Sequence, residues 1–469
     1  MKQLKIAILL ESDVVIRNFL TTKALQPLID NHDVTIILPD KDYKRVKSNP
    51  ELLGLGLSFA RTYIPHERTN VWRKMFHLDQ MRIRIRRDGW ATWVSWWGVL
   101  GWKSALMFFI LALPILRNLT LKVYGARLDN IPATSFQEAI ANLQPDVILH
   151  PSTFDGYFIN DMICVGNALD VPTVLLMNSW DNPSIKRACT GRPDYIAVWG
   201  EQTKQHTEYF MGMPSDRILQ LGAAQFEVYR PQPRITSKEF RREHALPDDA
   251  KVLLYAGSSR GADEALHLAW LEQAISDGIL PSDLKVVYRP HPWGVSQSQA
   301  SKILSAAWQH VTIENSMRDL VAACALAGRP DHFLMAEYER EHDLLSSIDM
   351  LISPLSTIIL EGAMHGVPVL CMVPIEEEGR SIWFRSIKRL THFREVFSSP
   401  DVVVCKRHSH FIPSVRKLYA MTENEGTKDA MKKFSEYFVE QHPVSYGRAI
   451  EEFLERLPVR QNASGSKAL

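Results

Sequence analysis

Cysteine is scarce in this 469-residue chain, and no two cysteines stand at the spacing of a metal or redox motif. The five cysteines are odd in number and widely scattered, which is typical of reduced, buried thiols in a cytoplasmic protein rather than of a disulfide framework. They are Cys164, Cys189, Cys324, Cys371 and Cys405. The opening residues MKQLKIAILLESD carry charges on both sides of a short apolar run and lack a small-residue cleavage site, so we expect no secretory signal there.

An excess of positive charge is also missing. The 54 Lys and Arg residues nearly balance the 53 Asp and Glu residues, and the formal net charge is +1. Binding of a long anionic polymer normally requires a basic excess, so the composition argues against nucleic acid as substrate or partner. The longest apolar run, residues 105–116, is about a dozen residues long where a membrane span needs about twenty, so we expect no transmembrane helix.

The two common glycine-rich phosphate motifs, GxxxxGK[ST] and GxGxxG, do not occur either. Strand and helix patterns nevertheless alternate in both halves, which predicts an α/β fold of two Rossmann-like, doubly wound domains with parallel sheets. The predicted strands are residues 5–11, 33–38, 146–150, 173–177, 195–199, 251–256, 284–288 and 348–352, and the main predicted helices are residues 18–31, 135–143, 156–169, 201–211 and 446–457.

A change of composition indicates the domain boundary. Residues 229–237, YRPQPRITS, contain two prolines and no apolar periodicity, which predicts a linker. We therefore expect an N-terminal acceptor domain over 1–230, with an atypical insertion at about 60–128, and a C-terminal donor domain over 238–440. Residues 441–469 would form a terminal helix and a disordered tail.

Three polar loops follow strands of the second half, and the carboxyl ends of parallel strands are where such sheets bind ligands. The first loop is a small-residue turn whose backbone N–H groups and guanidinium suit a phosphate: Gly257, Ser258, Ser259 and Arg260. In the second loop, RPHPW, two prolines fix the backbone, and Arg289 and His291 project from the strand end. Each loop alone is weak evidence, but three at successive strand ends favour a ligand site.

The third loop opens the most informative segment, SPLSTIILEGAMHGVPVLCMV, residues 353–373. The Ser-Pro pair at Ser353 ends a strand, and the hydroxyls of Ser356 and Thr357 stand where a helix begins, a position that attracts phosphate. Glu361 falls one helical turn beyond Thr357 on the same face, so its carboxylate can reach a ribose diol. Gly366 closes the predicted helix.

These motifs give the chain a resemblance to glycosyltransferases of GT-B fold, whose two Rossmann-like domains face each other across a cleft. The pairing of RPHP with SPLST resembles that of bacterial CMP-sugar transferases of the sialyl, polysialyl and Kdo-transferring kinds. Residues 353–368 are similar, more loosely, to the donor helix of UDP-sugar transferases and UDP-N-acetylglucosamine 2-epimerases. The loop SWDNPS, residues 179–184, stands where those epimerases carry a histidine and glutamate motif, which argues against epimerisation. The resemblance implies a CMP- or UDP-sugar donor held without a metal or other cofactor, and no convincing DxD-type metal motif is present.

Two carboxylates in the first half are candidates for the base that would accept a proton from the acceptor hydroxyl. Asp155 follows the strand at 146–150, and Asp181 follows the strand at 173–177. Each also has a structural interpretation, Asp155 as a helix cap and Asp181 as part of a turn before Pro183. We favour Asp155 because the glycine after it lets a substrate approach, although an inverting and a retaining mechanism both remain open.

The insertion is rich in tryptophan and arginine. Half of the twelve tryptophans lie close together, at Trp72, Trp90, Trp93, Trp96, Trp97 and Trp102. The arginines stand just before most of them, at Arg82, Arg84, Arg86 and Arg87. This order suits a segment, residues 82–116, that lies at a lipid interface, and it equally suits packing inside the first domain or in a dimer contact.

The sequence thus predicts a cytoplasmic, metal-independent glycosyltransferase of polysaccharide biosynthesis, peripheral to the inner face of the membrane if the insertion contacts lipid. It would move a sugar from a nucleotide donor to a surface glycan or a polyprenol- or lipid-linked acceptor. Two alternatives stay open. One is a CDP-polyol phosphotransferase, which the lack of a second histidine loop disfavours. The other is a non-catalytic sugar-nucleotide or glycan-binding protein, which would be favoured if both aspartates served only as caps.

Overall fold

The computed structural model describes residues 3–87, 101–154, 156–185, 191–258, 262–329, 337–373 and 390–457. By its internal contacts the chain divides into two compact units. Unit 1 comprises Met1–Gln80, Leu111–Glu227 and Glu440–Leu469, and unit 2 comprises Met81–Ile110 and Val228–Val439. Tryptophans 90, 93, 96 and 97 lie outside the described residues, as do the side chains of the four arginines at 82–87.

Unit 1 is built on a parallel sheet of seven strands in the order β3-β2-β1-β4-β5-β6-β7. The strands are β1 Lys5–Leu9, β2 Asp33–Pro39, β3 Ser58–Thr62, β4 Val147–Ser152, β5 Thr173–Met177, β6 Tyr195–Val198 and β7 Ile218–Gln220. The central strands are buried along their whole length, as their continuous apolar runs predict for a sheet covered on both faces. The sequence did not predict β3, which pairs with β2 from Thr35 to Pro39.

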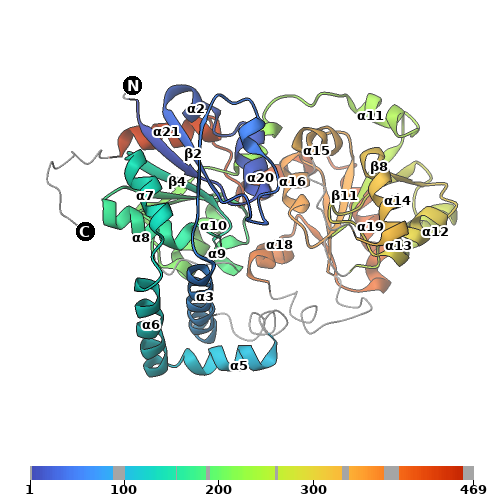
Figure 1. Cartoon of the computed structure of the whole chain (residues 1–469). Coiled ribbons are helices and arrows are strands. Elements are labelled where there is room, and N and C mark those ends of the chain that lie inside the picture. Colours follow the sequence, from blue (N-terminus) through green and yellow to red (C-terminus); the bar gives the residue numbers. More distant parts are fainter. Residues whose placement is uncertain are drawn as a thin grey trace. The chain divides into compact units, whose positions relative to one another are not determined.

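Helices cover the faces of this sheet, whereas α3 His66–Arg87 and α6 Pro114–Asp129 extend away from its strands (Figure 1). The other helices of unit 1 are α1 Asp13–Ile16, α2 Gln26–Asn31, α7 Thr134–Leu143, α8 Ile159–Leu169, α9 Asn182–Ile185, α10 Glu201–His206 and α21 Tyr446–Arg456. The single helix predicted over 18–31 is wrong. The chain becomes helical earlier, after the Ser12 cap, and breaks before α2, where Lys23 adopts a left-handed φ of 57°.

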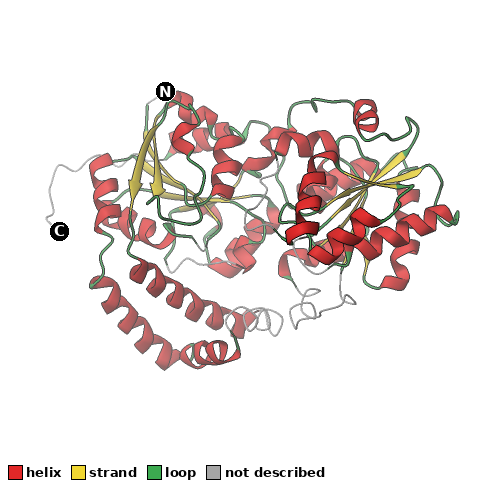
Figure 2. Ribbon diagram, turned by 45° about the vertical axis from the view of Figure 1, so that its right-hand side comes forward, coloured by secondary structure: helices red, strands yellow, loops and turns green. Residues whose placement is uncertain are grey.

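Unit 2 repeats the architecture with a parallel sheet of six strands in the order β10-β9-β8-β11-β12-β13. The strands are β8 Lys251–Ala256, β9 Leu284–Arg289, β10 Val311–Ile313, β11 Met350–Pro354, β12 Val369–Met372 and β13 Val403–Cys405. The helices are α5 Trp102–Leu111, α11 Ser237–Glu243, α12 Glu264–Ser276, α13 Gln297–Ser305, α14 Arg318–Ala327, α15 Tyr338–Leu345, α16 Ile358–Met364, α18 Arg394–Ser398, α19 Phe411–Met421 and α20 Thr427–Glu436. Figure 2 shows the strands of each unit with helices around them. The predicted α/β class with two doubly wound sheets is confirmed.

The strand order of each sheet defines one point where ligands are expected. The chain winds outward in both directions from β1 and β4 in unit 1, and from β8 and β11 in unit 2. Between such a pair of strands the loops at the carboxyl ends diverge and leave a crevice. The loops that follow these four strands are therefore the places to look for a site.

The last helix, α21, belongs to unit 1, where it packs against α2. Its buried residues Tyr446, Ile450 and Leu454 join the core beneath β1. The approach is close because a Cβ on Gly447 would lie 2.4 Å from the carbonyl oxygen of Ala24. Backbone cannot yield at that distance as a flexible side chain can, so the position requires glycine.

We predict that Gly447→Ala destabilises unit 1 by about 1–3 kcal/mol, because the added methyl overpacks the contact between α21 and the turn before α2. The control is Gly125→Ala, in the interior of α6, where an added Cβ would meet nothing within 4 Å. That change should be neutral or stabilising, since alanine is the better helix former. Urea unfolding followed by circular dichroism measures both, and equal stability of the two variants would contradict the packing argument.

Candidate functional site

The segment predicted to hold a nucleotide forms β11, a short turn and α16. The helix begins after Thr357 and ends at Met364, and Gly366 follows in the left-handed region with a φ of 76°, so the predicted helix and its glycine stop are confirmed. Gly362 allows α16 to lie directly on the sheet, because a Cβ there would stand 2.6 Å from the Leu351 side chain. The close contact fixes α16 beside the switch-point strand β11.

Glu361 is buried on α16 and is held by Tyr229. The Tyr229 hydroxyl donates a 2.6 Å hydrogen bond to Oε2 of Glu361. Burial, and then the nearby carboxylates of Glu361 and Glu341, raise the pKa of Tyr229, so it remains a donor at neutral pH. One oxygen of Glu361 therefore has a fixed donor from the chain itself. Glu361 is 7% exposed, so its carboxylate does not face open solvent.

Two histidines connect α16 to the segment after Tyr229. Nδ1 of His365 lies 2.7 Å from the Glu361 carbonyl oxygen, its Nε2 lies 2.8 Å from Nδ1 of His342, and Nε2 of His342 lies 2.9 Å from the Pro231 carbonyl oxygen. Burial is the main cause that lowers the pKa of His365 to about 4, so this ring is neutral at pH 7. The chain of contacts restrains the position of α16 relative to residues 229–231.

Arg289, at the end of β9, is buried and forms an ion pair with Glu341 of α15. His291 is half-buried two residues later, and its Nδ1 accepts a 3.1 Å hydrogen bond from the Trp293 backbone N–H. Burial, followed by the positive charges of Arg289 and Arg329, lowers the pKa of His291 to about 4. His291 is therefore neutral at pH 7, and its Nε2 can carry the proton and act as a donor.

The turn after β8 is organised around Glu264, the first residue of α12, which was not predicted as a site residue. Glu264 accepts hydrogen bonds from the Ser258 backbone N–H at 3.0 Å and from the Tyr288 hydroxyl at 2.6 Å. A Cβ on Gly257 would lie 2.5 Å from its Oε2, so glycine is needed there. The N–H of Ser258 is thus already occupied by a carboxylate. Ser259 and Arg260 lie outside the described residues.

The three hydroxyls of SPLST differ in their surroundings. Ser353 is fully buried and its Oγ donates to the Pro354 carbonyl oxygen at 3.0 Å, so its hydroxyl does not face a ligand. Ser356 and Thr357 are half-buried at the end of β11, and Thr357 makes no capping bond to α16. Of the three, only these two residues are partly exposed to solvent.

In unit 1, Asp155 lies outside the described residues, whereas Asp181 is described. Oδ1 of Asp181 accepts a 3.3 Å hydrogen bond from the Asn182 side chain, and its carbonyl oxygen accepts bonds from the backbone N–H and the hydroxyl of Ser184, both at 3.2 Å. These contacts are those of a turn that leads into α9, the structural role weighed for Asp181.

A buried pair at the switch point of unit 1, Glu11 and His150, was not predicted. Oε2 of Glu11 accepts the Phe158 backbone N–H at 3.0 Å, at the beginning of α8, and lies 3.5 Å from Nε2 of His150. A Cβ on Gly156 would overlap the Glu11 carboxylate, at 1.5 Å from Oε1. Burial is the main cause that lowers the pKa of His150, against an opposing effect of Glu11. The only sequence signal was an acid two residues beyond β1, which is too common to single out.

A cavity of about 310 Å³ also lies in unit 2, between α11 and α15. Its lining is strongly charged and includes none of the predicted site residues: Arg234, Ile235, Phe240, Glu243, His244, Glu314, Glu337, Arg340, Asp343 and Leu344. Arg234 is paired there with Asp343 at 2.8 Å. Within the described ranges, no group of three or more His, Cys, Asp or Glu side chains is arranged to hold a metal ion.

Comparison with known proteins gives a match in structure alone. No family model and no curated protein matches the sequence. UDP-N-acetylglucosamine 2-epimerase from Neisseria meningitidis, solved with UDP-GlcNAc, is similar with a TM-score of 0.53 and 13% identity over 96% of this chain and 99% of that one. S. aureus MnaA, solved with UDP, has a TM-score of 0.51 and 12% identity, with 97% of each chain covered. MurG from Acinetobacter baumannii follows with a TM-score of 0.46 and 11% identity over 97% of this chain and 100% of that one.

At identities this low the likeness shows the fold alone, and the MurG score is too low to support an argument. The fold part of the resemblance seen in the sequence is confirmed: the chain has the two-unit α/β fold of GT-B-type enzymes. The structural similarity does not show which nucleobase the sugar donor would carry. The two neighbours with the higher scores were solved with UDP or UDP-GlcNAc, and CMP-sugar transferases are not among the proteins compared above.

We predict that Glu264 makes the free energy of unfolding depend on pH. Burial, its largest cause, raises the pKa of this carboxyl from 4.5 to about 7. Between those values the folded state binds more protons than the unfolded state, so the free energy of unfolding falls as pH rises, by about 3 kcal/mol in total, and levels off above about pH 7.

The variant Glu264→Gln should lack this decline. Its stability relative to wild type should therefore improve steadily between pH 5 and 8, as measured by urea unfolding across that range. Parallel pH profiles for the two proteins would show that Glu264 remains ionised in the folded state.

Proposed function

We propose that the protein is a glycosyltransferase that uses a nucleotide-sugar donor, a CMP- or UDP-sugar, bound by unit 2. The observation that carries the proposal is the position of Glu361. Its buried carboxylate lies one turn beyond the half-buried hydroxyls of Ser356 and Thr357, next to the switch-point strand β11. A carboxylate and hydroxyls at this spacing complement the diol and the phosphate of a nucleotide.

The surroundings of Glu361 prepare it for that role. Tyr229 fixes one carboxylate oxygen, and His365 fixes the backbone of the same residue, so little side-chain entropy is left to lose when a ribose binds. Arg289 is similarly held by Glu341. A site whose residues are already restrained binds with a smaller entropic cost than one that must assemble around its ligand.

Chemistry at the donor would depend on the departing phosphate. Negative charge develops on it as the bond to the sugar breaks, and donors aimed at that charge stabilise the transition state more than the ground state. Ser356 and Thr357 offer hydroxyl donors, and neutral His291 offers its Nε2–H, because its Nδ1 already accepts a hydrogen bond. Arg289 supplies a buried positive charge at the end of β9, two residues before His291.

A second candidate is a sugar-nucleotide epimerase. It is favoured by the two structural neighbours with TM-scores of 0.53 and 0.51, one of which is itself a 2-epimerase. The loop at residues 179–184 disfavours it, because Asp181 and Asn182 there form a local turn rather than present a histidine and a glutamate. The CDP-polyol phosphotransferase and the non-catalytic binding protein remain weaker alternatives.

One experiment separates these candidates. A thermal-shift panel of CMP, CDP, UDP and GDP identifies the nucleotide, because a ligand that binds only the native state raises the melting temperature according to its affinity. Incubation with the matching nucleotide-sugar, followed by NMR, then distinguishes release of nucleotide from inversion of a sugar carbon. Absence of any nucleotide shift would remove both the transferase and the epimerase.

The role of Glu361 can be tested with UDP. We predict that Glu361→Gln weakens UDP binding about tenfold or more in calorimetry, because the amide cannot accept two ribose hydroxyls while it also accepts Tyr229. The matched control is Glu339→Gln on α15, an exposed residue that should leave the affinity unchanged. Equal binding by wild type and Glu361→Gln would assign Glu361 a purely structural role with Tyr229.

For the base in unit 1, we keep Asp155 as the proposal and Asp181 as its control. Asp155→Asn should leave nucleotide affinity intact and lower turnover about a hundredfold or more, since a general base commonly contributes that much. Asp181→Asn should have a small effect, because the Asp181 contacts are those of a turn. The reverse result would exchange the two roles, and full activity in both variants would favour a retaining mechanism.

The acceptor is proposed to be a surface glycan or a polyprenol- or lipid-linked sugar, and the protein to work in the cytoplasm. Among the described residues, no single helix is both long and apolar enough to cross a membrane. Only α5 and α6 taken together, with a sharp bend at the break between them, have that length and composition.

A further inference from the structure

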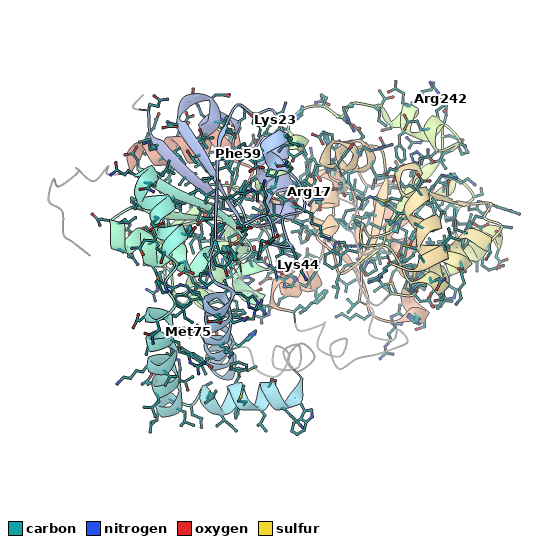
Figure 3. All side chains as sticks on the ribbon, viewed as in Figure 1. Arg17, Lys23, Lys44, Phe59, Met75 and Arg242 are labelled. Atoms are coloured by element: carbon teal, nitrogen blue, oxygen red, sulfur yellow. The ribbon has the colours of Figure 1, made fainter. Side chains whose placement is uncertain are left out.

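Helix α6 of unit 1 has two faces of opposite character. One face packs against α3, where Val71, Trp72 and Leu128 form a small buried cluster. Met75, labelled in Figure 3, also packs against this cluster. The two helices lie side by side, away from the strands of the sheet (Figure 1). This inner face is therefore satisfied by contacts within unit 1.

The outer face of α6 is apolar and uncovered. Ile115, Leu119 and Val123 follow one another at intervals of four, so they form one stripe along the helix, and their exposed fractions are 76%, 56% and 54%. Leu113 and Leu116 extend the stripe at its beginning and are also exposed. An aliphatic stripe of this length in water is unfavourable, and on a soluble protein it marks a binding surface.

Basic residues border the stripe. With 3.6 residues per turn, Lys122 lies beside the line through Ile115, Leu119 and Val123, and Arg127 is the next residue on that line, at its far end. Both are exposed. From residue 101 to residue 128 the sequence contains Lys103, Arg117, Lys122 and Arg127, and the first acidic residue is Asp129, at the end of α6. Arg117 forms an ion pair with Asp79 of α3 at 3.6 Å, so the cations that lie along the stripe are Lys122 and Arg127. An apolar stripe with cations along its borders has the pattern of a helix that lies in the plane of a lipid interface.

Helix α5, considered by itself, shows the same pattern. Trp102, Leu106 and Ile110 are exposed at intervals of four, whereas Ala105 and Phe108 are buried. The aromatic ring at the beginning of the helix is of the kind that prefers the headgroup level of a membrane. Of the nineteen large apolar side chains that are exposed in the described part of the chain, nine lie between Trp102 and Val123.

We propose that α6 binds the surface of a membrane that contains anionic lipids, and that α5, by its own exposed apolar stripe, can bind such a surface as well. The basic residues along the stripe favour a negatively charged partner, and the continuous apolar stripes favour one with a hydrocarbon interior. Each helix is too short to span a bilayer alone, which suits attachment in the plane of the surface. The proposal does not depend on the proposed transferase activity.

The test is flotation of the full-length protein with vesicles of phosphatidylcholine, with and without phosphatidylserine, at low and high salt. Wild type should float with the anionic vesicles and much less with the neutral ones, and salt should weaken the binding. In the triple variant Ile115→Ser, Leu119→Ser and Val123→Ser, the fraction of protein that floats with the vesicles should be at least tenfold lower than in wild type. Lys122→Gln with Arg127→Gln should lose binding mainly to the anionic vesicles.

The control replaces three exposed leucines elsewhere, Leu52→Ser, Leu304→Ser and Leu326→Ser, and should float like wild type. UDP calorimetry on the α6 variants shows whether the rest of the chain is intact, so failure of the donor site and failure of this proposal are distinguishable. Wild type that stays at the bottom of the gradient overturns the proposal. A triple variant that floats like wild type also overturns the proposal. The proposal is overturned as well if, in ultracentrifugation without vesicles, wild type is a dimer and the only effect of the triple variant is to make it a monomer.

Discussion

Each sheet of this protein has a buried glutamate at its switch point, and the surrounding loops are shaped by it. In unit 1, Glu11 accepts the Phe158 N–H, and in unit 2, Glu264 accepts the Ser258 N–H. The carboxyl end of a parallel sheet presents unpaired backbone donors, and a buried carboxylate satisfies them without water. Both loops must then contain glycine, Gly156 and Gly257, because any Cβ would collide with the carboxylate.

This constraint decides which groups remain for a ligand. Because Glu264 occupies the Ser258 N–H, the phosphate contacts that we propose for unit 2 are those of Ser356, Thr357 and the end of β9. Tyr229 and His365 fix Glu361 in the same region. The proposed donor site is therefore one in which buried carboxylates and their neutral partners are arranged before any nucleotide arrives, which suits a site that must stabilise developing charge.

The sequence could predict much of the fold and part of the site. Continuous apolar runs identified β5 and β8 to the residue, and the spacing from Thr357 to Gly366 identified α16 and its end. It did not predict the break before α2, where Lys23 adopts a left-handed φ and where Gly447, from a helix some four hundred residues later, packs against the Ala24 carbonyl oxygen. It also missed β3, a half-buried edge strand whose pattern is weaker than that of the central strands.

The sequence by itself determined the fold class, the central strands of both sheets and the residues at their ends, because these follow from local periodicity and from turn chemistry. Only the tertiary structure decided the partners and charge states of those residues. Tyr229 meets Glu361, Arg289 meets Glu341, and His291 is neutral because burial and two arginines surround it. It also decided that Trp72 is buried while the outer stripe of α6 is exposed. Such pairings depend on distances between residues far apart in the chain and on local burial, and neither is encoded in the pattern of any one segment.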